Sequence, residues 1–310
     1  MPTERTWRKV RLGIGEEGNF GNKIMSDKHT TILTITCPDT TGIIAAVSGF
    51  LSEHNCFINE AAQYGDPISK RFFMRCVFQP GPLSPPKADL EKSFSMLGER
   101  FQMIWHMHDG NKKHRLLVLV SKFDHCLNDL LYRYRTGSLA VEIPAVVSNH
   151  PDMERMVEWH GIPFHHLPVT KDNKLIQEAK ILEMIDRLHI DLVVLARYMQ
   201  VLSPEMCQAL AWRAINIHHS FLPSFKGAKP YHQAHSRGVK IIGATAHYVT
   251  TDLDEGPIID QAVERVDHTH TPDDLVAMGR DIENLVLSRA VRYHTEQRVL
   301  PNGAKTVVFK

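Results

Sequence analysis

Apolar and polar positions follow two different patterns along the 310-residue chain, and the change between them falls near residue 110. From residue 31 to residue 108, short β-branched runs with a two-residue alternation predict strands, and apolar residues at helical spacing predict helices. The predicted strands are 31–36, 57–64, 71–79 and 101–108, and the predicted helices are 43–54 and 87–100. This βαββαβ order is that of a ferredoxin-like fold.

Beyond a polar linker at 110–113 the predicted strands are continuous apolar runs, as expected of parallel strands buried on both faces. Helical segments such as 175–188 lie between them, so the pattern predicts an α/β, doubly wound, mostly parallel, Rossmann-like sheet. Ligands of such sheets bind outside the carboxyl ends of the strands. The predicted elements are strands 116–120, 145–147, 192–195 and 239–249, a loop 250–255, a strand from 257, a helix 272–294 and a hairpin turn at 301–303.

The first 28 residues carry charges and glycines but no apolar core of a secretory signal. We interpret them as a poorly ordered extension, with Met25 as an alternative start of the chain. The pattern then predicts a first domain at 29–109, the linker 110–113 and a second domain at 114–310. These boundaries follow the change of hydrophobic period rather than any repeat.

Composition excludes several classes of protein. The net charge is +1, so no bulk field favours nucleic acid or an anionic membrane as a partner. The five cysteines form no CxxC pair, which argues against a zinc knuckle or a disulfide framework. No apolar run is long enough to span a bilayer. We therefore expect a cytoplasmic globular protein with reduced, buried cysteines and neither a nucleic-acid nor a membrane partner.

The stretch 215–261 holds the candidate chemistry. Asn216 and His218 would project from the same face of a strand, and Asp254 lies in the polar loop 250–255. An amide can stabilise a developing oxyanion, a histidine can protonate a departing nitrogen, and a carboxylate can orient that imidazole. No serine or cysteine nucleophile is evident, so these residues favour attack by water on an amide-like bond. An Asn-x-His pair on a strand is, however, also commonly structural.

The segment that follows His218 contains Pro223, Gly227 and Pro230 and is predicted to be a loop. Together, Asn216-Ile217-His218-x-Ser220-x-Leu222-Pro223, His247 and Leu253-Asp254-x-Gly256-Pro257 resemble the signature of the formyltetrahydrofolate-dependent formyltransferase family. The resemblance covers roughly residues 114–295 and implies a catalytic triad of Asn216, His218 and Asp254. It also implies a folate site on segment 195–202 and loop 248–254, formed largely by backbone groups. The substrate-binding residues expected on this basis are Arg197, Tyr198, Met199, Val201, Leu202, His247, Thr250 and Leu253.

The N-terminal unit, with Pro38-Asp39-Thr40-Thr41-Gly42 before its first helix, resembles an ACT domain. Such domains commonly bind amino acids between copies, which implies a possible amino-acid effector and a homo-oligomer. An ACT unit followed by a formyltransferase-like domain resembles the formyltetrahydrofolate deformylase family, as do His219 and residues 227–231. The resemblance implies hydrolysis of 10-formyltetrahydrofolate to tetrahydrofolate and formate, which would supply formate for purine biosynthesis and balance the folate pools. Asp39–Gly42 would line an effector pocket or cap the first helix.

Glycinamide ribonucleotide formyltransferases are the alternative. They resemble the second domain but carry a glycine-rich loop after its first strand, whose free N–H groups bind the acceptor's phosphate. Here that segment is 121–126 and lacks glycine, and Asp124 is predicted to cap the helix itself. We therefore expect a narrowed acceptor side, with Phe221, Phe225 and Tyr231 as the residues that narrow it. A non-catalytic folate or amino-acid sensor is a third reading, opposed by the intact triad.

Two histidine pairs raise the question of a metal. His232-x-x-His235 and His165-His166 lack a clear third ligand, so we expect no metal, and the resemblance implies no cofactor beside the folate substrate. The cations Arg197, Lys226 and Lys229 could meet the carboxylates of a folate glutamyl tail. Solvated surface charge is the equal alternative for them.

Overall fold

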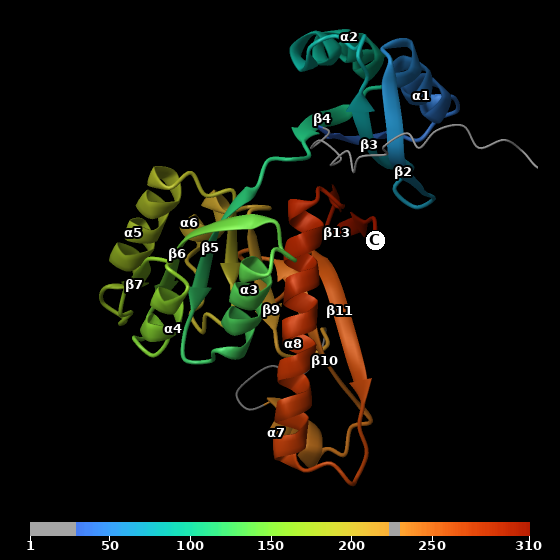
Figure 1. Ribbon diagram of the computed structural model, residues 1–310. Coiled ribbons are helices and arrows are strands. Elements are labelled where there is room, and N and C mark those ends of the chain that lie inside the picture. The colour runs from blue at the N-terminus through green and yellow to red at the C-terminus, as the bar shows by residue number, and fades with distance from the viewer. Residues whose placement is uncertain (1–28, 223–229) are drawn as a thin grey trace, which may run out of the picture.

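The computed structural model describes residues 29–222 and 230–310, whose strands form a four-stranded, a seven-stranded and a two-stranded sheet (Figure 1). The predicted N-terminal extension and residues Phe225, Lys226 and Lys229 lie outside the described residues. The division of the chain at 109–114 stays a prediction.

The four-stranded sheet is antiparallel, with the order β2-β3-β1-β4. Two helices cover one face, where Leu33, Ile35 and Phe78 pack with Phe50 and Phe94. The βαββαβ order predicted from the pattern is therefore confirmed. Its elements are β1 (Thr31–Pro38), α1 (Ile43–Glu53), β2 (Cys56–Asp66), β3 (Arg71–Pro80), α2 (Lys87–Arg100) and β4 (Ile104–Asp109).

Two local predictions in this part were wrong. The predicted strand 101–108 begins only at Ile104, because the chain leaves α2 through a turn in which Gln102 has a φ of 52°. Helix α1 has no side-chain cap from Asp39–Gly42. Its N-cap is Gly42 itself, at a φ of 91° that a side chain would disfavour.

The seven-stranded sheet has the order β11-β10-β9-β8-β5-β6-β7. Its first five strands in sequence are parallel, and β10 and β11 run antiparallel to them. The mostly parallel, doubly wound sheet is confirmed. Its elements are β5 (His114–Val120), α3 (His125–Arg135), β6 (Val141–Ser148), α4 (Glu154–Trp159), β7 (Phe164–His166), α5 (Lys174–Arg187), β8 (Leu192–Leu195), α6 (Pro204–Ala209), β9 (Ala214–His218), α7 (Pro230–Ser236), β10 (Ile241–Tyr248), β11 (Ile258–Arg265) and α8 (Pro272–Thr295).

Helices cover both faces of this sheet, which explains its continuous apolar strands. One face packs against α3, α4, α7 and α8, and the other against α5 and α6. On β9, Ile215 and Ile217 face the α8 side, whereas Ala214 belongs to the core under α5 and α6. By the two-residue alternation of a strand, Asn216 and His218 project on the same face as Ala214.

Two predictions around this sheet were also wrong. Pro230 does not extend the loop but begins α7, a position where the missing N–H of proline leaves no helical bond unmade. Asp124 does occupy the N-cap position of α3, yet it has helical backbone angles and its side chain makes no capping hydrogen bond. The start of α3 therefore keeps its own N–H groups uncapped by this carboxylate.

The chain ends in a hairpin of β12 (Val299–Asn302) and β13 (Lys305–Val308), with Gly303 at a φ of 62°. This confirms the predicted turn. The hairpin returns to the first sheet (Figure 1), where Leu300 and Phe309 pack on Phe73. None of the helices in the described part of the chain has the length and apolarity that crossing a membrane requires.

Candidate active site

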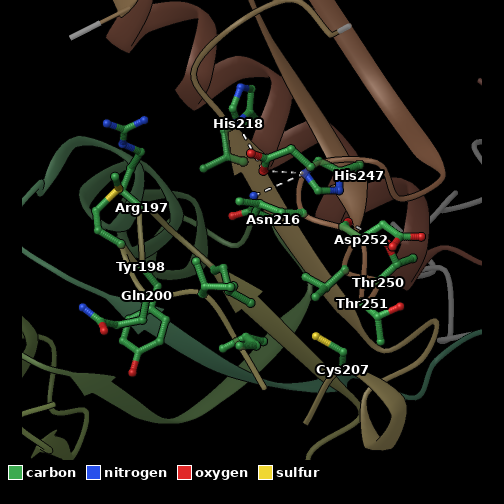
Figure 2. A pocket seen from close by; sticks show the side chains of 18 of the residues that line it. Arg197, Tyr198, Gln200, Cys207, Asn216, His218, His247, Thr250, Thr251 and Asp252 are labelled. Carbon is green, nitrogen blue, oxygen red and sulfur yellow. Dashed lines mark hydrogen bonds and ion pairs between the residues drawn. The ribbon is translucent and has the colours of Figure 1, made fainter. Parts of the chain in front are cut away.

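A cavity of about 310 Å³ lies beside β8, β9 and β10 and is bordered by the loop that follows β10 (Figure 2). Its size falls in the range of small-molecule sites. Every residue predicted for catalysis or substrate binding lines it. The lining comprises Leu195, Arg197, Tyr198, Met199, Gln200, Val201, Leu202, Cys207, Asn216, Ile217, His218, His219, His247, Val249, Thr250, Thr251, Asp252, Leu253 and Asp254.

The three residues of the predicted triad meet at one end of this cavity. His218 ends β9, and its Nδ1 lies 3.2 Å from Oδ1 of Asp254. Strand pairing places His247 of β10 directly opposite Asn216, and the same Asp254 oxygen lies 3.7 Å from His247 Nε2. One carboxylate therefore faces two imidazoles, and the carboxamide lies beside one of them.

Asp254 is held in an unusual position by its loop. Its φ is 59°, in the left-handed region, and a Cβ on Gly256 would come within 1.7 Å of the Tyr248 carbonyl oxygen. Glycine at 256 therefore lets the loop return against β10. Burial would raise the pKa of Asp254, but hydrogen bonds from His218 and His247 outweigh it and hold that pKa below its usual range. The carboxylate stays ionised near neutral pH.

The orientation of the Asn216 amide follows from its neighbour. His247 Nδ1 lies 2.9 Å from the carbonyl oxygen of Tyr248, which fixes the proton on Nδ1 when the ring is neutral. The Nε2 lone pair then accepts a hydrogen bond from Asn216 Nδ2 at 3.3 Å. This contact leaves the second amide hydrogen of Asn216 available to an oxygen in the cavity.

Ser220 is a member of the site to which sequence reasoning assigned no role. Its hydroxyl lies 3.1 Å from His218 Nε2, the nitrogen that does not face Asp254. Thr245, on the neighbouring strand, donates to the Ser220 carbonyl and accepts from the Leu222 amide, so it fixes the chain just after His218. The signal available in the sequence was position alone, two residues after His218.

The predicted folate-binding segment contributes side chains of two kinds. Tyr198 and Leu202 are buried, whereas Met199 and Val201 are more than half exposed, as is Leu253 in the opposite loop. Apolar side chains exposed around a cavity are typical of a ligand mouth. The roles predicted for these residues, and for Thr250, stay predictions.

Arg197 does not extend freely towards solvent. Its Nε lies 3.5 Å from Glu283 Oε2, and its guanidinium carbon lies 5.0 Å from the centre of the Phe123 ring. Tyr231 also contacts Glu283 and is buried, whereas Phe221 is 40% exposed. Of the residues predicted to narrow the acceptor side, Tyr231 therefore faces inward, Phe221 lies largely at the surface, and Phe225 falls outside the described residues.

Within residues 29–222 and 230–310, one group of side chains could hold a metal ion, namely His125, Cys126 and Glu283. Neither of the histidine pairs weighed from the sequence belongs to it. Glu283 is already contacted by His125 and Tyr231, with the Arg197 cation beside it. Burial raises the pKa of the Cys126 thiol well above its usual value, which disfavours the thiolate that a metal prefers.

Comparison with known proteins agrees with this geometry. The model of the formyl transferase family matches residues 114–291. A formyltetrahydrofolate deformylase of Corynebacterium sp. (strain P-1) is 53% identical over 92% of this chain and all of that protein. One of Bacillus subtilis is 47% identical over 89% of this chain and 93% of its own length.

Solved structures give the same result. The crystal structure of formyltetrahydrofolate deformylase from Burkholderia mallei matches 91% of this chain and 100% of its own with a TM-score of 0.86 and 53% identity. A glycinamide ribonucleotide transformylase from Symbiobacterium toebii matches only 66% of this chain, with a TM-score of 0.60 and 31% identity. The chain therefore belongs to the formyl transferase family and, within it, to the formyltetrahydrofolate deformylases.

Proposed function

We propose that this protein hydrolyses 10-formyltetrahydrofolate to tetrahydrofolate and formate, with Asn216, His218 and Asp254 as its catalytic residues. The observation that carries the assignment is the convergence of a carboxamide, an imidazole and an ionised carboxylate at one end of a cavity that can receive a ligand. The names of relatives that are 42–53% identical support the same reaction.

The geometry suits each step of the reaction. Asp254 accepts the Nδ1 proton of His218 and so leaves Nε2 for proton exchange, with the Ser220 hydroxyl as its partner in the absence of substrate. The O–H of a water molecule adds to the formyl carbon while Asn216 donates to the developing oxyanion. The C–N bond then breaks, and its nitrogen receives a proton through His218. No step in this sequence requires a metal, and we propose that none acts.

Segment 195–202 and loop 248–254 would hold the folate, with backbone groups of Arg197 to Leu202 and of Thr250 and Leu253 as its partners. The exposed side chains of Met199, Val201 and Leu253 give this end an apolar mouth. Since Arg197 is paired with Glu283, we assign its guanidinium to the reacting end of the cavity rather than to a glutamyl tail.

The four-stranded unit at 29–109 is proposed to be an ACT regulatory domain, joined by the linker 110–113 to a catalytic domain at 114–310. Its βαββαβ sheet supports this. An amino-acid effector and a homo-oligomer belong to the same proposal. All five cysteines are free and buried, which supports a reducing, cytoplasmic location. The wider role would be to supply formate for purine biosynthesis and to balance one-carbon folates.

Formate release from 10-formyltetrahydrofolate without any acceptor tests the function. We expect the purified protein to release formate and His218→Ala to reduce kcat by roughly 10²–10⁴-fold, the usual contribution of general acid–base catalysis. His235→Ala, an exposed substitution on α7, is the matched control and should retain the wild-type rate. Formate-free wild-type enzyme that transfers the formyl group only to glycinamide ribonucleotide would favour the transferase instead.

A further inference from the structure

We propose that a buried network centred on Arg197 and Glu283 closes the reacting end of the cavity to amines and so restricts the nucleophile to water. The inference rests on the proposed function and assigns the specificity of that same site. It concerns residues outside the triad.

The network is built on Glu283 in the middle of α8, whose side chain is 2% exposed. Its Oε1 accepts a hydrogen bond from the Tyr231 hydroxyl at 2.9 Å, and its Oε2 lies 2.8 Å from His125 Nε2. Arg197 is the third partner, at 3.5 Å. A buried carboxylate is tolerable only with such partners, so these side chains are fixed to one another.

Four separate segments meet in this network. His125 begins α3, Arg197 follows β8, Tyr231 lies in α7, and Glu283 lies in α8. Figure 1 shows α3 and α7 beside α8. The packing is close, because a Cβ on Gly279 would come within 2.1 Å of the Tyr231 ring. Tyr231 therefore cannot turn aside without moving α8.

The network reaches the catalytic residues through Arg197 and His219. Arg197 lines the cavity, and in Figure 2 it lies on the opposite side of Asn216 from Thr250 and Asp252. The His219 ring stacks 4.9 Å from His218 and lies 6.5 Å from the Tyr231 ring. The wall formed by Arg197 and His219 is thus supported from behind by buried, hydrogen-bonded groups.

Arg197 holds this position at a conformational cost. Its φ is 63°, a left-handed value that favours glycine, so a non-glycine residue here is strained. The strain directs a long, planar side chain against Phe123 and Glu283. Because Glu283 neutralises the guanidinium, the cation is not available as a phosphate site for an acceptor.

This arrangement separates water from amines by size. Water needs only the space of one small molecule beside the formyl carbon. An amine acceptor would have to displace Arg197 or His219 and break the Glu283 contacts. In such a transfer the amine nitrogen would bond to the formyl carbon, the C–N bond to folate would break, and an amine proton would pass to the folate nitrogen.

The test is the ratio of N-formylglycinamide to formate when free glycinamide is added with 10-formyltetrahydrofolate. This ratio does not depend on the amount of folded enzyme. The variant is Arg197→Gly combined with Glu283→Gln, which opens the wall, relieves the left-handed strain and leaves no unpaired charge. Tyr231→Ala opens the same wall from behind. We expect wild type to give formate alone and each variant to raise the ratio by about tenfold or more.

Two matched controls keep the wall intact. Tyr231→Phe preserves the ring, and Gln200→Ala alters a lining side chain that points away from His218 in Figure 2. Both should keep the wild-type ratio. The proposal is overturned if both opened variants keep that ratio, if they produce neither product, or if wild type already formylates glycinamide. Absence of formate from wild type would instead refute the proposed function.

Discussion

At the scale of single residues, the site depends on one carboxylate that serves two rings. Asp254 contacts His218 and lies near His247, and His247 in turn holds the Asn216 amide. The sequence motif was enough to predict that these four residues converge, because each lies in the short stretch 215–261. Ser220 and Glu283 were not found, since their roles depend on side-chain directions or on a partner far along the chain.

Replacement of Asp254 by asparagine should remove most of the catalytic rate. The amide cannot carry the negative charge that stabilises a protonated His218, and it can stabilise the wrong tautomer. We expect kcat for formate release to fall by roughly 10²–10⁴-fold with a much smaller change in KM, as for a triad carboxylate. Glu255→Gln, an exposed neighbour that does not line the cavity, is the control. An Asp254→Asn variant with near wild-type kcat would remove Asp254 from the mechanism.

At the scale of elements, hydrophobic period predicted the long strands and helices well but not the short or capped ones. Helix α7 was missed because Pro230 normally ends regular structure, and only its place at the first helical position permits it here. The caps expected from Asp124 and from residues 39–42 are not formed by side chains. Capping depends on the backbone angles of one residue, which a pattern of apolar positions does not determine.

The loop between β10 and β11 gives a prediction at this scale. Gly256→Ala would place a methyl group 1.7 Å from the Tyr248 oxygen and 3.1 Å from His247 Nδ1, so the loop must move. We expect the free energy of unfolding to fall by about 1–3 kcal/mol, the usual cost of overpacking. Displacement of Asp254 should lower kcat as well. Thermal unfolding and formate release measure both effects.

Gly49→Ala is the matched control for that substitution. Gly49 lies within helix α1, and a Cβ there would meet no atom within 4 Å. Alanine should therefore be neutral or stabilise the helix by up to about 1 kcal/mol. Equal behaviour of the two alanine variants would show that the close approach at Gly256 does not hold the loop.

At the scale of the whole molecule, the C-terminal hairpin connects the two large sheets. Besides the apolar contact with Phe73, Arg75 of the first sheet donates to the Glu296 carbonyl just after α8, at 3.1 Å. Arg298 lies 3.2 Å from Glu60, which also pairs with Arg75. The sequence predicted the hairpin but not its docking, because nothing local in residues 299–309 specifies a partner more than two hundred positions away.

Acid should destabilise both large sheets together. Burial lowers the pKa of His108 to about 4, of His219 to about 4 and of His294 to about 3. The unfolded chain, with histidine pKa values near 6.5, therefore takes up protons first as pH falls below that value. Stability is then complete above about pH 6.5 and declines toward pH 4, by up to about 2 kcal/mol for each histidine at pH 5.

Thermal unfolding followed between pH 7.5 and pH 5 measures this decline, and His294→Gln isolates one contribution. His294 accepts from the Tyr248 hydroxyl at 2.8 Å, a bond that a glutamine oxygen can still accept. Because glutamine does not titrate, the variant should lose less of its Tm on acidification than wild type, in proportion to about one proton. A Tm that is constant from pH 7.5 to pH 5, or an equal decline in the two proteins, would show that His294 is not held neutral in the folded chain.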